Sequence, residues 1–463
     1  MSIPVFFVRS LTDACRAYGP ALANPSEFVR SIFLAGVIAS GAFARPAAAV
    51  ELAADLGSGT RLTLGKAQQI ALDRSRQLAA QDAAVTATRE MGVAAGQMPD
   101  PVLKIGVDNL PVTTSDRFSL TRDFMTMRRV GVMQELTRAD KRQARTDRFE
   151  REAEKTQAEK IVTVAAIERD TALAWLDRYY SEAMAAVVAE QGLQATLEIQ
   201  SAEGAYRAGR GSQADIFAAR GAVAAFDDRA SEIARRIRSA TTTLARWAGD
   251  AASLPLAGQP VIDRIRLDPE MLDRQLAHHP EILVLQKQEE IAQAEVRSAQ
   301  ANRSADWSVE VAYQQRGPAF SNMVSVGVSI PLQWDQKNRQ DRELSAKLAL
   351  VDKAASEREE SLRMHIAETR SMIDEWRTGR ERIARYEREL IPLANDRTLA
   401  AVTAYRGGKS GLNDVLAARR NTIEVRIQAL QLQAETARLW AQLNFLAPDE
   451  GLHAARMLPG AEK

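Results

Sequence analysis

The chain has little of what many folds use to hold themselves together. It contains one cysteine, Cys15, among 463 residues, so no disulfide can form within one chain. Only 5% of its residues are aromatic, which is thin material for a large globular core and suits long helices that pack through small side chains. The net charge of +1 lacks the basic excess of nucleic-acid binders, and we expect no nucleic-acid partner.

Catalytic motifs are missing as well. The sequence has no glycine-rich phosphate loop, no nucleophile elbow, no histidine–cysteine metal spacing and no paired carboxylates in a plausible pocket. The four histidines, His278, His279, His365 and His453, do not form a ligand set, and the pair at 278–279 is expected to start a helix. We therefore expect neither an enzyme nor a bound cofactor.

Long apolar runs are absent except near the N-terminus. Residues 29–49 combine a basic start, an apolar stretch of about a dozen residues and a small-residue end, which is typical of a secretory signal peptide. A membrane-spanning helix would need about 20 apolar residues. We expect residues 1–49 to be an N-terminal extension with a signal peptide, and Val50 to be the first residue of the mature protein.

The most informative feature of the sequence is an internal duplication. Residues 206–220 reappear at 405–419 without a gap, each time as Tyr-x-x-Gly followed by an aspartate. Duplication of a whole structural unit fixes the architecture. The predicted segments are repeat 1 at 50–249, a linker at 250–266, repeat 2 at 267–448 and a C-terminal tail at 449–463.

Each repeat is expected to contain two strands and a long helical hairpin. Alternation of apolar and polar residues predicts strands with two different faces. A proline-free stretch from 112 to 254, and a heptad-like seam from Leu344 to Trp376, predict helices of about 65 residues, on the order of 100 Å long, with a kink at Pro392. The expected elements are strands at about 102–110, 128–137, 306–315 and 322–334, and hairpins at about 139–249 and 338–447.

The apolar faces of the strands have two interpretations, a soluble core or contact with lipid. The export signal, and the lack of any other segment to cover the strands, favour lipid. Four strands cannot close a barrel, so several copies must pool them: two would supply eight strands, and three would supply twelve with room for an aqueous lumen. The expected lumen-facing residues are Lys104, Asp108, Glu135, Glu310 and Gln314.

The order of signal peptide, short helix, strand pair, long hairpin, linker and repeat resembles the TolC family of outer-membrane efflux channels. The resemblance covers roughly residues 62–448 and is carried by the segments 100–106, 131–136 and 327–332 and by the paired Tyr-x-x-Gly turns. It implies a mainly α fold with a membrane β-barrel portion. The assembly would be a homotrimer with a 12-stranded barrel in the outer membrane of a Gram-negative bacterium and an α-helical tube in the periplasm. The implied partners are outer-membrane lipid, a periplasmic adaptor (membrane fusion) protein and an inner-membrane pump of the resistance-nodulation-division type.

The same resemblance assigns roles to the hairpin tips. It implies that Asp414 lines the closed pore aperture, with Asp215 as its counterpart in the other hairpin. The implied adaptor contacts are Tyr206, Gly209, Tyr405 and Gly408. The alternative is that both aspartates only cap the returning helices and that the tyrosines and glycines only form the turns.

The segments 98–111 and 122–128 look most like branches of the family that work with heavy-metal cation pumps. Four methionines lie near the proposed barrel, Met98, Met125, Met127 and Met133. Thioethers are soft ligands for Cu(I), which favours copper or silver as cargo, although ordinary methionine packing explains the same residues. Two alternatives stay open: drug or organic-solute efflux or type I protein secretion on the same fold, and a periplasmic coiled-coil interaction protein without a pore.

Overall fold

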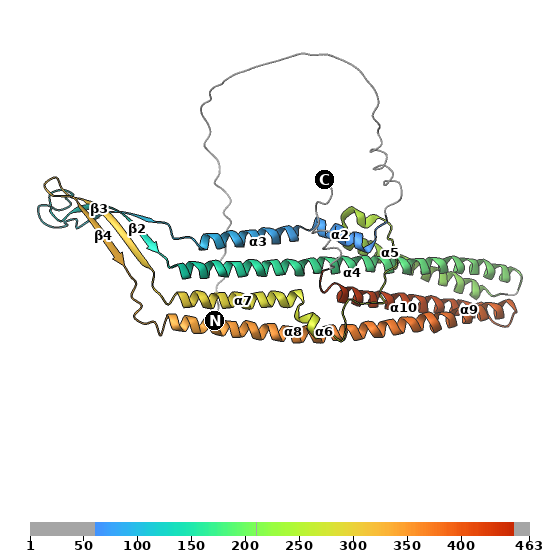
Figure 1. The fold of residues 1–463 in the computed structure, drawn as a ribbon. Helices are drawn as coiled ribbons and strands as arrows, with labels where there is room; N and C mark the ends of the chain where they lie inside the picture. The colour runs from blue at the N-terminus through green and yellow to red at the C-terminus, as the bar shows by residue number, and fades with distance from the viewer. Residues whose placement is uncertain (1–60, 210, 449–463) are drawn as a thin grey trace, which may run out of the picture. The chain divides into compact units, whose positions relative to one another are not determined.

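The computed structural model describes residues 61–209 and 211–448, so the expected signal peptide at 1–49 and the tail at 449–463 lie outside the described residues. The described residues form a mainly helical unit with one small antiparallel sheet, as the sequence predicts (Figure 1). None of the helices in these ranges is both long and apolar enough to cross a membrane.

Repeat 1 begins with two short helices whose first turns are capped by hydroxyls. The side chains of Thr63 and Ser75 accept hydrogen bonds from the backbone two or three residues into each helix, which satisfies donors that have no partner inside the helix. The 69-residue helix α4 is unbroken, so it spans about 100 Å. The helices are α2 (Leu64–Arg74), α3 (Arg76–Ala95), α4 (Ala139–Arg207), α5 (Gln213–Ala248) and the 3₁₀ turn η1 (Gly249–Ser253).

Repeat 2 differs because its first long helix is interrupted. Its helices are α6 (Leu272–Ala277), α7 (Pro280–Ala301), α8 (Gln340–Arg385), the π-helical segment η2 (Tyr386–Leu390), α9 (Ile391–Arg406) and α10 (Leu412–Asn444). Pro392 lacks an N–H, and its ring crowds the carbonyl of Arg388, which lies in η2. The disruption that we expected at Pro392 therefore takes the form of a π-helical turn directly before it.

The sheet holds four antiparallel strands in the order β1-β2-β3-β4. The strands are β1 (Val102–Asp108), β2 (Met127–Leu136), β3 (Trp307–Gln315) and β4 (Met323–Ser329). The expected strand at 322–334 was too long at its C-terminal end. Ser329 already pairs with Ser308, one residue from the start of β3, and Pro331 has no N–H to donate to a ladder.

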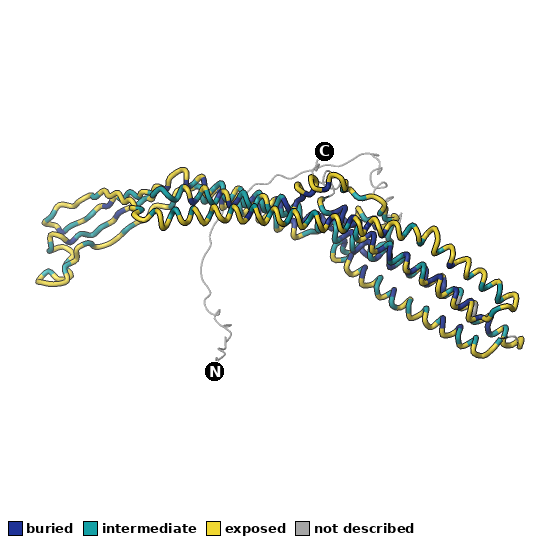
Figure 2. The backbone as a smooth tube through the Cα atoms, turned by 90° about the horizontal axis from the view of Figure 1, so that it is seen from below, coloured by how far each residue is buried: buried dark blue, intermediate teal, exposed yellow. Residues whose placement is uncertain are grey.

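Three tryptophan side chains on the helices donate hydrogen bonds to backbone carbonyls of extended segments. Trp175 of α4 donates to the carbonyl of Leu62 at 3.0 Å. Trp376 of α8 and Trp440 of α10 donate to linker carbonyls at 3.1 Å and 2.8 Å, respectively. Trp376 and Trp440 both belong to the second hairpin, so these tryptophan hydrogen bonds hold the linker against repeat 2. Helix α10 contacts α4, α5, α8 and α9, and buried positions gather along these helices in Figure 2, whereas the strands are mostly exposed or half-buried.

The seam predicted along α8 is buried only in its second half. Thr369, Ile373 and Trp376 are buried, whereas Leu344 is half-buried and Leu348 is 50% exposed. The described chain therefore leaves half of Leu348 uncovered. Helix α7 does run beside this part of α8, where Lys347 pairs with Glu295 at 2.8 Å. Periodicity therefore identified the apolar side of α8, but it did not reveal which of these residues face a neighbouring helix.

Candidate functional site

The sheet has two chemically different faces. Residues that pair side by side across strands share a face, and the register aligns Lys104 with Gly131, Gly131 with Ala312 and Ala312 with Ser325. This register puts all five expected lumen residues on the same face: Lys104, Asp108, Glu135, Glu310 and Gln314. The strand alternation seen in the sequence therefore predicted which side chains lie together.

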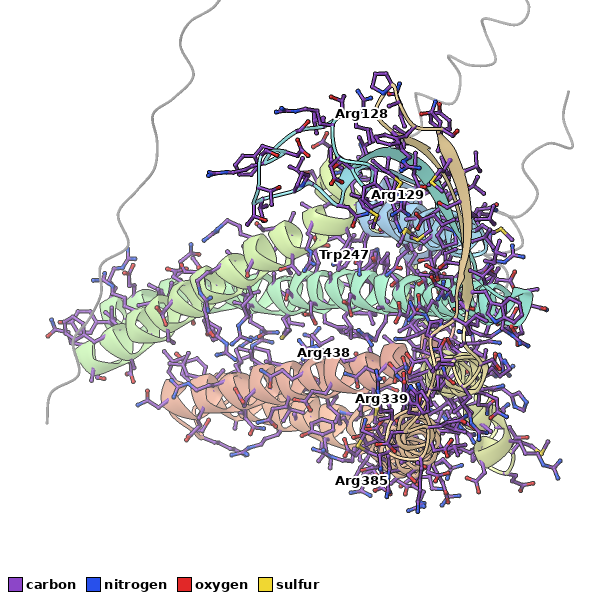
Figure 3. All side chains as sticks on the ribbon, turned by 90° about the vertical axis from the view of Figure 1, so that its left-hand side faces the viewer. Arg128, Arg129, Trp247, Arg339, Arg385 and Arg438 are labelled. Carbon is purple, nitrogen blue, oxygen red and sulfur yellow. The ribbon has the colours of Figure 1, made fainter. Side chains whose placement is uncertain are left out.

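An ionic cluster lies in the middle of the polar face. Lys104 Nζ lies 2.6 Å from Glu310 Oε2, and the guanidinium of Arg129 also pairs with Glu310. Arg129 Nη1 lies 3.8 Å from Asp108 Oδ2, so the cluster joins β1, β2 and β3 (Figure 3 labels Arg129 and its neighbour Arg128). A surface with these fixed charges is suited to contact with water or ions.

Arg129 is a polar-face residue that the sequence interpretation missed. Strand β2 alternates imperfectly, because Arg128 falls among the apolar positions and Met133 among the polar ones. Counting back from Glu135 in steps of two would have found Arg129. The polar face is also crowded at Gly131, where an added Cβ would come within 2.8 Å of the Cβ of Ala312, so only glycine fits there without movement.

The opposite face of the sheet is apolar and uncovered. Ile105 is 74% exposed and Val326 is 70% exposed, and nothing within the described ranges packs over them. The exposed apolar residues on this face are Leu103, Ile105, Val107, Val130, Val132, Leu136, Trp307, Val311, Tyr313, Val324, Val326 and Val328. A contiguous exposed apolar surface of this kind indicates contact with lipid or with another protein.

The methionines do not form one ligand set. Met127 and Met133 lie on the polar face of β2, but they are about 20 Å apart along a strand that rises about 3.3 Å per residue. Met98 precedes β1, and Met125 lies between β1 and β2. One chain therefore cannot bring Met127 and Met133 to the same ion.

The two hairpin tips have the same backbone turn. Gly209 and Gly408 both adopt φ of 70°, which side chains with a Cβ rarely adopt. Their N–H groups donate to the carbonyls of Tyr206 and Tyr405, both at 3.0 Å. The glycines at these two positions are thus required by the turn itself.

The side chains at the two tips differ. Tyr206 is 49% exposed, whereas Tyr405 is half-buried against the tip cluster, a group of six buried residues from α4, α5 and α10. The tip cluster consists of Ala202, Ala219, Ala222, Leu412, Val415 and Leu416. It packs the two hairpin ends together, and of the two tyrosines Tyr206 is the more accessible to another protein.

The two tip aspartates also differ. Asp215 forms a capping box: its carboxylate accepts from the backbone N–H of Ser212 at 2.9 Å, and its own N–H donates to Ser212 Oγ at 3.2 Å. Helix α10 instead begins after Gly411, which offers no side-chain cap. Asp414 is exposed, and its carboxylate has no hydrogen-bond or ion-pair partner in the described structure. Helix capping therefore explains the aspartate at position 215, whereas the carboxylate of Asp414 takes no part in a cap.

The structure corrects one expectation about the histidines. His279, Glu281 and His365 each place one ligand atom within 4.8 Å of the others, although the sequence gave no sign of such a set. The signal was missed because His365 lies in α8, far along the chain from the start of α7. Burial, and then the neighbouring His365, lower the pKa of His279 despite its hydrogen bond to Leu446, so this ring is neutral near pH 7.

Comparison with known proteins identifies the fold. No protein-family model matches the chain. The cobalt-zinc-cadmium resistance protein CzcC of Cupriavidus metallidurans is 25% identical over 309 residues, which are 64% of this chain and 71% of that protein. The outer membrane protein VceC of Vibrio cholerae is 19% identical with a TM-score of 0.68, over 83% of this chain and 95% of that one.

CusC, whose crystal structures concern transmembrane channel formation, is 14% identical with a TM-score of 0.69, over 83% of this chain and 92% of that one. These similarities agree with two features of the structure, which are the sheet with one polar and one apolar face and the two long helical hairpins. The chain therefore has the fold of the outer-membrane efflux channels, which confirms, for the fold, the resemblance to the TolC family that its sequence indicated.

Proposed function

We propose that this protein is the outer-membrane channel of a tripartite efflux system that exports divalent heavy-metal cations. The observation that carries the proposal is the sheet, because one face holds an ionic cluster and the other exposes a continuous apolar surface. Such strands suit a barrel wall between water and lipid. The protein would act as a passive duct, and the pump would select the cargo.

The assembly we propose is a homotrimer. The described sheet leaves one edge of β1 and one edge of β4 without a strand partner, and open edges cannot remain unpaired in lipid. Three copies of a four-stranded sheet supply twelve strands, enough to close a barrel with an aqueous lumen. The long helices would continue the wall as a periplasmic tube.

The tips are the proposed docking and gating end. Tyr206, with its exposed ring, and the turn glycines Gly209 and Gly408 would contact a periplasmic adaptor. Three unpaired Asp414 carboxylates around the symmetry axis would form an anionic ring that favours cations. An inner-membrane pump of the resistance-nodulation-division type would complete the system.

The proposed cargo follows the sequence relative. The name of that relative, a cobalt-zinc-cadmium resistance protein, supports divalent cations rather than the copper or silver that the methionines suggested. The separation of Met127 and Met133 removes one argument for a Cu(I) site in the barrel. We therefore propose cobalt, zinc or cadmium.

A deletion strain tests the cargo. It should lose tolerance to cobalt, zinc or cadmium, keep its tolerance to dyes and antibiotics, and recover with the wild-type gene. Lost drug tolerance with unchanged metal tolerance would instead support the organic-solute alternative. The wild-type protein should run as a heat-modifiable trimer from outer-membrane fractions, whereas a soluble monomer would support the non-pore alternative.

A pair of substitutions tests the barrel itself. Ile105→Lys puts a charge on the apolar face, where it should cost about 2–4 kcal/mol in lipid and abolish trimer assembly and complementation. Gln314→Lys puts the same charge on the polar face and should preserve both. Equal behaviour of the two variants would contradict a lipid-facing sheet.

A further inference from the structure

The His279 cluster, formed by His279, Glu281 and His365, lies where three parts of repeat 2 meet. His279 is the N-cap of α7 and is 6% exposed, and His365 is half-buried in α8, which packs against α7. The two rings lie 4.4 Å apart between centroids. Glu281, in the first turn of α7, contributes a carboxylate on the exposed side.

The hydrogen bonds of His279 fix its tautomer and leave the lone pair of Nδ1 in only one weak hydrogen bond, which an ion could replace. Nε2 lies 2.6 Å from the carbonyl oxygen of Leu446, so Nε2 carries the proton and donates it. Nδ1 then accepts a long, 3.3 Å hydrogen bond from the backbone N–H of Glu281. A ring whose other N–H is tied to a backbone carbonyl is the usual arrangement of a metal-binding histidine, since the carbonyl fixes the tautomer and the ring orientation.

His365 supplies the second observation. Its Nε2 is buried, yet it has no hydrogen-bond partner among the described residues. A buried polar nitrogen without a partner costs free energy, and water or an ion would normally satisfy it. The nearest groups that could share such an ion with it are the other two members of the cluster.

We propose that His279 Nδ1, His365 Nε2 and a carboxylate oxygen of Glu281 bind a borderline divalent cation, with Zn²⁺ as the best fit. Two imidazoles and one carboxylate form a three-ligand set that leaves a fourth position open to water. Hard ions such as Mg²⁺ prefer oxygen ligands and fit poorly. The proposal does not rest on the efflux function, because it concerns binding to the purified protein.

Binding requires a small closure of the site and the replacement, by the ion, of the weak cap hydrogen bond from the Glu281 N–H to His279 Nδ1. The ligand atoms lie within 4.8 Å of one another, and a tetrahedral zinc site with bonds of about 2.0–2.1 Å needs separations of roughly 3.4 Å. Rotation of the exposed Glu281 side chain and a small tilt of the His365 ring would provide most of that change. His279 would keep its hydrogen bond to Leu446, so the ion would connect α7, α8 and the segment that follows α10.

Zinc titration of the full-length protein in detergent tests the proposal. The wild-type protein, stripped with a chelator, should bind one Zn²⁺ per chain by calorimetry and show tetrahedral Co²⁺ absorption. His365→Gln and Glu281→Gln should each weaken binding at least tenfold. Zn²⁺ should raise the Tm of the wild type but not that of His365→Gln.

His278→Gln is the matched control. His278 is adjacent in sequence but exposed, and its Nδ1 is engaged with the carbonyl of Arg274 at 3.0 Å, so this variant should bind Zn²⁺ like the wild type. Glu281→Gln changes an exposed residue, which keeps the test valid if His365→Gln does not fold. Absence of zinc binding in the wild type, wild-type affinity in Glu281→Gln, or equal binding of Mg²⁺ would overturn the site. Metal tolerance of cells is a separate readout, and its loss or retention leaves this result unchanged.

Discussion

The two hairpin tips share a backbone and differ in what their side chains do. Both turns place a glycine at φ of 70° and hydrogen-bond it to the tyrosine three residues before it. Asp215 is held in a capping box with Ser212, whereas Asp414 follows Gly411 and has no such partner in the described structure. The backbone needs the turn in both copies, but it needs the carboxylate in only one. The aspartate whose carboxylate takes no part in a cap is the better candidate for a functional role.

The largest expected effect on stability comes from removing an ion pair that joins the two repeats. Asp306, just before β3, accepts from Lys141 Nζ at 2.7 Å and from the backbone N–H of Arg138 at 3.1 Å. Lys141 is 6% exposed, so Asp306→Ala would leave a buried ammonium unpaired and cost about 3 kcal/mol of unfolding free energy. Chemical denaturation would measure the loss. Asp341→Ala, which removes a half-exposed partner of Arg303, is the control and should cost no more than about 1 kcal/mol.

The same pair predicts a dependence on pH. Burial raises the pKa of Asp306, but the hydrogen bonds from Lys141 and Arg138 outweigh it and hold the pKa below the ordinary 3.8. The native state therefore binds this proton less readily than the unfolded state, so the stabilisation is complete above pH 3.8 and lost as the pH falls through the native pKa. Asp306→Asn should flatten the acid limb of the stability profile, and an unchanged limb would contradict this account.

The second largest effect separates the two tip tyrosines. Tyr405→Ala removes a half-buried ring from the tip cluster and should cost about 2 kcal/mol, less than a fully buried aromatic. Tyr206→Ala removes an exposed ring and should leave the unfolding free energy within about 0.5 kcal/mol. We expect Tyr206→Ala to weaken cross-linking to the proposed periplasmic adaptor instead. Equal destabilisation by both substitutions would show that the tips are packed alike.

The third prediction concerns the aspartates. Asp414→Asn removes an acidic group from the first turn of α10 and should cost only about 0.5 kcal/mol. In planar bilayers, however, it should reduce the preference for cations, because the proposed anionic ring is lost. Asp215→Asn should leave ion selectivity unchanged while weakening the capping box. A selectivity change in the second variant alone would assign the aperture to the other hairpin.

The smallest expected effect comes from making the tips alike. Gly411→Ser creates the same Ser-x-x-Asp spacing at the second tip. Gly411 has φ of −80°, and an added Cβ would meet no atom closer than 4.0 Å, so serine fits there. The new cap should add only a few tenths of a kcal/mol. It should also draw the Asp414 carboxylate back to the backbone and lower cation selectivity part of the way toward that of Asp414→Asn. Unchanged selectivity would argue that Asp414 does not face the pathway.

The regular parts of the fold could be predicted from the sequence because their signals are local. Period-two alternation located the strands and their polar face, and the duplicated turn located both tips. Features that depend on distant neighbours could not be found in this way. The end of β4 depends on where β3 begins, the exposure of Leu348 depends on which side of α8 its neighbours pack against, and His279 meets His365 only after α7 and α8 pack.

The uncovered sheet has a consequence for how the protein must be made. In the proposed outer-membrane setting, a copy that folds alone would expose apolar strands with unpaired edges to water. There, identical copies could aggregate as readily as they close into a barrel. The competition between aggregation and barrel closure depends on the protein concentration. Slow synthesis, or binding to a chaperone, would therefore favour correct assembly. Overproduction should then yield insoluble protein, even at expression levels at which the helices alone would still fold correctly.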